Sequence, residues 1–140
     1  MNWQTLAANS PYQTAVAIKQ QLDVGDSLEA SRGIEELIAA LSRSEKRTLK
    51  SQLIRLMMHI IKWHTQPERR SLSWLATIDN ARDEIADIQE ETPSLNEAVI
   101  RTLWDKAFIA AKRAAEAEMG TSSAITQLDW VDVFQRQYKL

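Results

Sequence analysis

The chain has no cysteine, which excludes disulfides, thiolate metal sites and thiol nucleophiles together. Glycine and proline occur only three times each, too few for the many tight turns of an all-β protein. The longest near-apolar run, 53–61, contains Arg55 and His59 and falls far short of the roughly 20 residues that span a membrane. The N-terminus also lacks the basic and apolar regions of a secretory signal. We therefore expect a cytoplasmic, helical protein.

The overall amino-acid composition is that of an ordinary globular protein. The 140 residues are 44% hydrophobic and 26% charged, which predicts a single domain over 1–140. Charge is uneven along the chain: residues 43–70 carry eight Lys or Arg against two Asp or Glu, whereas residues 71–100 carry one against seven. We expect these two segments to complement each other within the fold.

The scarcity of glycine and proline and the spacing of apolar residues predict an all-α fold. We expect a compact bundle of five or six helices around a central apolar helix at about 44–64. Ser10 before Pro11, Ser44, and the capping box of Ser94 and Glu97 are expected to start helices. Gly120 is expected to end one. The predicted helices cover 11–22, 28–41, 44–64 and 94–119, and a further one begins between 68 and 73 and ends at 91. Residues 121–140 are expected to form a divergent tail or a short extra helix.

Two features indicate how the helices pack. Apolar residues at spacings of three and four predict that two helices each turn one face to the core. A glycine inside the second helix, Gly33, costs about 1 kcal/mol relative to alanine, and one explanation for it is close approach by a neighbouring helix. The predicted core residues are Ile34, Leu37, Ile38 and Leu41 in the second helix, and Leu49, Leu53, Leu56, Met57 and Ile60 in the central one.

The region from Ser44 to Ile85 resembles a bacterial family catalogued as domain of unknown function twenty-nine. The resemblance is carried by Ser44-Glu-Lys-Arg47, His59-Ile-Ile-Lys-Trp63, Gln66-Pro-Glu-Arg-Arg-Ser71, Ser73-Trp74, Thr77-Ile78 and Arg82. It extends more weakly over 11–120 and implies a compact helical bundle with no established activity. The family typically has glutamine at the position of His64 and a different end after Gly120, so a role for either would be particular to this chain.

One candidate site is a polar cluster of Glu36, His59 and Arg82, which the resemblance also singles out. We expect it to be an interior hydrogen-bonded network that fixes how the helices align. The alternative is a pocket that binds a ligand or carries out catalysis.

A second candidate is the basic and aromatic turn between the central helix and the next one. Cations beside aromatic rings can bind anions or single-stranded nucleic acid. The alternative is that the arginines pair with acidic helix faces while both tryptophans lie in the core. The turn consists of Lys62, Trp63, His64, Arg69, Arg70 and Trp74.

No motif for chemistry is present. His59 and His64 are five residues apart and point about 140° away from each other on a helix, so they cannot hold one metal ion. No catalytic residue, cofactor or metal site is predicted, and an enzyme is the less favoured class. We expect an interaction protein whose partner is another protein or a second copy. Nucleic-acid binding at the turn is the first alternative, and an enzyme or ligand binder at the polar cluster is the second.

Overall fold

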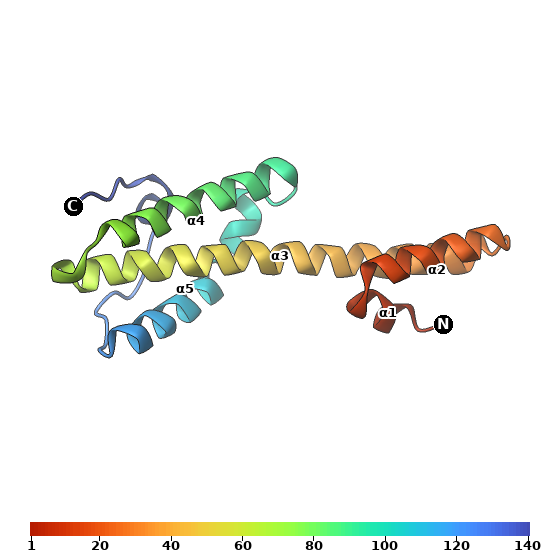
Figure 1. Cartoon of the computed structure of the whole chain (residues 1–140), viewed down its shortest axis with the longest axis horizontal. Coiled ribbons are helices and arrows are strands. Elements are labelled where there is room, and N and C mark those ends of the chain that lie inside the picture. Colours follow the sequence, from red (N-terminus) through yellow and green to blue (C-terminus); the bar gives the residue numbers. More distant parts are fainter. The chain divides into compact units, whose positions relative to one another are not determined.

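A computed structural model describes all residues, 1–140, and every regular element in it is helical. The predicted all-α fold is therefore confirmed (Figure 1). The elements are α1 Trp3–Asn9, α2 Pro11–Asp23, α3 Ser27–Thr65, η1 Pro67–Arg69, α4 Leu72–Glu91, α5 Glu97–Met119 and η2 Val131–Gln135. No helix combines the length and the apolar content that a membrane crossing requires.

Contacts divide the chain into two compact units, Met1–Arg47 and Thr48–Leu140, and α3 contributes to both. Each unit has its own core. The single domain expected over 1–140 stays a prediction.

The first unit consists of α1, α2 and the beginning of α3. Asn2 and Ser10 start α1 and α2, because their side chains accept hydrogen bonds from the N–H groups of Thr5 and Gln13. The Ser10 start was predicted, whereas the short α1 was not. Its start signal is an asparagine before only seven helical residues, a segment too short to be distinctive on its own.

A small apolar core joins these three helices. It consists of Trp3, Ala17, Ile18 and Ala30, with Leu6 and Leu37 packed against it. A methyl group at Gly33 would lie 2.7 Å from Cγ1 of Ile18 and 2.8 Å from the ring of Trp3. The close approach predicted at Gly33 is therefore present.

The expected break between helices 28–41 and 44–64 is absent, because α3 is continuous from Ser27 to Thr65. Ser44 lies inside the helix and is no helix start. The physical reason is that nothing near it stops a helix: no glycine or proline occurs between Gly33 and Pro67. A serine followed by an acidic residue is a start signal only where the preceding chain is not already helical.

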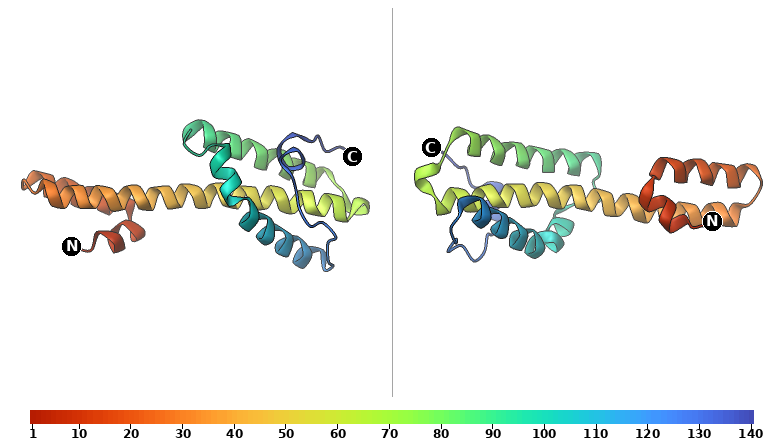
Figure 2. Two further views of the ribbon diagram at one scale, coloured as in Figure 1. Left: turned by 180° about the vertical axis from the view of Figure 1, so that it is seen from behind. Right: turned by 60° about the horizontal axis from the view of Figure 1, so that its bottom comes forward.

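The second unit packs α4 and α5 against different sides of its part of α3 (Figure 2). The predicted central stripe, Leu49, Leu53, Leu56, Met57 and Ile60, is fully buried. From α4 the core receives Ile78, Ala81 and Ile85, and from α5 it receives Ile100, Ala107, Ala111 and Ala115. The small side chains of α5 let it approach closely.

Capping residues set where α4 and α5 begin and where α5 ends. Ser71 accepts from the N–H of Trp74 and starts α4. Asn96, rather than the predicted Ser94, starts α5 by accepting from the N–H of Val99. Gly120 ends α5 with φ +70°, as predicted.

The segment 121–140 folds back over the second unit as an irregular strap with one short π-type helix, η2. It places Leu128 and Val133 in the core. Trp130 stacks on Trp104 at a ring-centre distance of 5.7 Å, and Trp104 Nε1 donates to the carbonyl of Leu128 at 2.9 Å. The prediction for this segment was a tail or a short extra helix. The strap contains both an irregular chain and one short helix, η2.

Candidate functional site

The predicted basic and aromatic turn is assembled in the second unit, but most of its cations bind other parts of the same unit. Lys62 is only 4% exposed. Its Nζ donates to Oε1 of Glu118 at 2.7 Å and lies 4.8 Å from the centre of the Trp74 ring. This hydrogen bond lowers the pKa of Glu118. Lys62 therefore joins three helices and presents no charge to an outside ligand.

Trp63 and Arg70 form the next contact along the turn. The Arg70 guanidinium lies 4.9 Å from the Trp63 ring centre, and its Nε donates to the Trp63 carbonyl at 2.8 Å. Arg70 thereby satisfies a carbonyl at the end of α3, which had no partner within the helix. Arg69 is exposed, and neither Arg69 nor Arg70 makes an ion pair, so the pairing with acidic helix faces that was the alternative for this turn is absent.

The two histidines lie in different surroundings. His59 Nδ1 donates to the carbonyl of Arg55 at 2.9 Å, which assigns the ring proton to that nitrogen. Burial, and then the nearby Lys62 ammonium, lower the pKa of His59. The His64 ring meets Tyr138 edge to face at 5.6 Å, and burial lowers its pKa as well. Both rings are therefore favoured in the neutral form.

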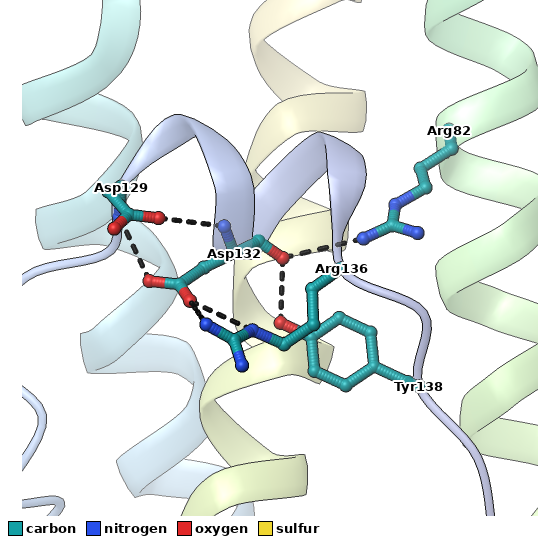
Figure 3. Close-up of polar contacts among 5 residues, drawn as sticks. All are labelled: Arg82, Asp129, Asp132, Arg136 and Tyr138. Carbon is teal, nitrogen blue, oxygen red and sulfur yellow. Dashed lines mark hydrogen bonds and ion pairs between the residues drawn. The ribbon is translucent and has the colours of Figure 1, made fainter.

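Arg82 binds backbone carbonyl groups of the strap. Its Nε donates to the carbonyl of Val133 at 2.8 Å, and its Nη2 donates to the carbonyl of Asp132 at 3.4 Å. The hydroxyl of Tyr138 donates to the same Asp132 carbonyl at 2.6 Å, and Arg136 pairs with the Asp132 carboxylate at 3.1 Å. Figure 3 shows these groups converging on one turn of the strap.

No hydrogen bond or ion pair joins any two of Glu36, His59 and Arg82. Glu36 lies in the first unit, where it lines a shallow depression with Trp3 and Arg32. His59 and Arg82 lie in the second unit and bind the carbonyls named above. The polar cluster therefore stays a prediction. No three side chains among histidine, aspartate and glutamate come together in a way that could hold a metal ion.

A surface that the sequence pattern assigned to the core lies exposed on α3 in the first unit. Ile34, Ile38 and Leu41 are 43%, 62% and 44% exposed, whereas Leu37 is half-buried. The expectation that all four are core residues is therefore wrong for three of them. The reason is that α1 and α2 cover the adjacent face of α3. Spacings of three and four residues describe a stripe but do not say what packs against it.

Comparisons with known proteins identify one family. The family described as Domain of unknown function DUF29 matches residues 12–135. The match extends to residue 135 and so includes most of the segment after Gly120, whose divergence from the family stays a prediction. No curated protein and no solved structure matches the chain. Because the match covers nearly the whole length, the chain belongs to the DUF29 family.

Proposed function

We propose that the chain acts by binding another protein, and that the partner packs on Ile34, Ile38 and Leu41 of α3. These residues are spaced four and three apart, which places them on one face of the helix. The same spacing forms the contact seam when two helices pack side by side. A helix of a partner protein therefore fits this apolar stripe.

The observation that carries the proposal is that large aliphatic side chains stay exposed here. Fully burying one such side chain contributes about 1.5–3 kcal/mol. Within the first unit, α1 and α2 pack on Ala30, Gly33 and Leu37 and leave the stripe uncovered. A partner helix would bury it.

The edges of the stripe also suit a protein interface, which has an apolar centre and a polar rim. Ser31, Glu35 and Ser42 lie along one side of it, and Glu45 follows Leu41 at its end. All four are exposed. The two carboxylates favour a partner helix with basic side chains flanking its apolar face.

Nucleic-acid binding at the turn has less support. Lys62 is paired and buried, Arg70 binds Trp63, and Trp63 itself is buried. Binding of single strands needs open aromatic faces and free cations. At this turn only Arg69 keeps an exposed cation with no ion pair.

The test is affinity capture from lysate of the producing cells, followed by mass spectrometry, with three forms of the full chain. Ile38→Glu disrupts the stripe, and Ile109→Glu makes the same change at a 57% exposed isoleucine of α5. We expect a protein that is retained by the native chain and by Ile109→Glu but lost with Ile38→Glu. Retention that is equal for all three forms would refute the proposal.

A further inference from the structure

Two arginines of the first unit lie beside a small depression. Arg43 and Arg47 are one helical turn apart on α3, and both are exposed. They line a depression of about 250 Å³ whose other lining residues are Ala8, Pro11, Ala40 and Ser44. On α3 this face is turned away from the apolar stripe, so binding at the depression is independent of the proposed function.

Neither arginine has an anionic partner. The chain's i,i+3 and i,i+4 arginine pairs, such as Arg32 with Glu29 and Arg101 with Glu97, show how helix neighbours neutralise this side chain elsewhere. No acidic residue lies three or four positions from Arg43 or Arg47. Glu45 is two positions from each, roughly 200° around the helix, and so faces away from both.

The pair is therefore a concentration of positive charge held in place by the helix. Like charges at i,i+4 repel each other and destabilise a helix. An anion between the two guanidinium groups would convert that repulsion into attraction. The planar guanidinium matches the oxygen geometry of phosphate and can donate two hydrogen bonds to it.

The size and lining of the depression limit what can bind there. Its volume is below the roughly 300–1,000 Å³ of pockets that hold drug-sized ligands. Ala8 and Ala40 offer no side-chain hydrogen bond for a second polar group. We propose that Arg43 and Arg47 bind the phosphate group of a small phosphorylated molecule, seated over these two alanines.

The proposal is tested by titrating the full chain with inorganic phosphate and with glycerol phosphate at low ionic strength, followed by two-dimensional amide NMR. Sodium chloride at matched ionic strength is the reference. We expect shifts concentrated in residues 8–13 and 40–47, and at least tenfold weaker binding in the double variant Arg43→Gln/Arg47→Gln. Because both side chains are exposed, the variant is expected to fold, and its own spectrum checks this.

The matched control is Arg69→Gln/Arg113→Gln, which removes the same charge from two exposed arginines of the second unit. It should bind both phosphates as the native chain does. Equal weakening in both double variants, shifts spread over all basic residues, or failure of glycerol phosphate to bind would each overturn the proposal. Tighter binding of glycerol phosphate than of inorganic phosphate would identify an organic phosphate as the ligand.

Discussion

The buried ammonium of Lys62 lies 2.7 Å from the carboxylate of Glu118, whose own side chain is 55% exposed. The two partners therefore differ in their access to water. Glu118 can be hydrated if it loses Lys62, whereas Lys62 cannot be hydrated if it loses Glu118. An uncompensated buried charge is among the costly defects of a folded protein.

This asymmetry predicts that Glu118→Ala destabilises the fold more than Lys62→Met does. We expect Glu118→Ala to lower the free energy of unfolding by about 1–3 kcal/mol, and Lys62→Met, which keeps an apolar stem under Trp74, by about 1 kcal/mol or less. Urea denaturation of both variants measures the difference. The opposite order would show that the ammonium is not held by Glu118.

Gly33→Ala is expected to destabilise the first unit even though alanine favours helix by about 1 kcal/mol. The added methyl group would lie 2.7 Å from Ile18 and 2.8 Å from Trp3, which is too close for carbon atoms. Overpacking of this kind costs about 1–3 kcal/mol. Thermal unfolding checks it, with Ser42→Ala, at an exposed position of the same helix, as the control. A stabilised Gly33→Ala protein would rule out the close packing.

Arg82→Leu should loosen the strap while leaving the helices intact. Arg82 donates to the carbonyls of Asp132 and Val133, and hydrogen bonds from a charged donor are worth about 1.5–3 kcal/mol. Amide hydrogen exchange should therefore accelerate at residues 131–136 and stay unchanged in the core of α3. Arg113→Leu, which removes an exposed cation from α5, serves as the comparison. Unchanged exchange in the strap would mean that Arg82 does not anchor it.

Stability should also fall at high pH through Tyr138. Burial raises the pKa of Tyr138 to about 12, whereas an unfolded tyrosine has a pKa of about 10. The contribution of the protonated phenol is therefore complete below about pH 10 and is lost as the pH rises towards 12, because the unfolded chain releases its proton first. The free energy of unfolding of the native chain should fall more steeply over this range than that of Tyr138→Phe. Tyr12→Phe, which changes an exposed tyrosine, should show the same dependence of the free energy of unfolding on pH as the native chain. If Tyr138→Phe also showed the native pH dependence, the loss of stability could not be assigned to Tyr138.

The helix boundaries could be predicted where the local sequence signal is compatible with a helix end and with little else. Ser10 before Pro11 and Gly120 at the end of a long periodic segment each mark a boundary that no other structure explains as well. Ser44 and Ser94 carry the same kind of signal, yet α3 passes through the first and Asn96 replaces the second. A capping side chain acts only if the neighbouring backbone leaves the helix.

The candidate sites were less predictable, because long-range partners decide them. Nothing near Lys62 in the sequence indicates Glu118, and nothing near Arg82 or His64 indicates Tyr138. The stripe of Ile34, Ile38 and Leu41 has the spacing of a core face, and only the placement of α1 and α2 shows that it is exposed. Spacing identifies a face, whereas its role depends on what covers it.

The proposed role of that stripe is tested most directly by photocrosslinking in the producing cells. A photoreactive amino acid is placed at position 38, and in a separate protein at position 109, where the side chain is exposed to a similar extent. If a partner packs on the stripe, a covalent adduct with another protein forms from position 38 and none forms from position 109. Equal adducts from both positions, or an adduct from neither, would contradict it.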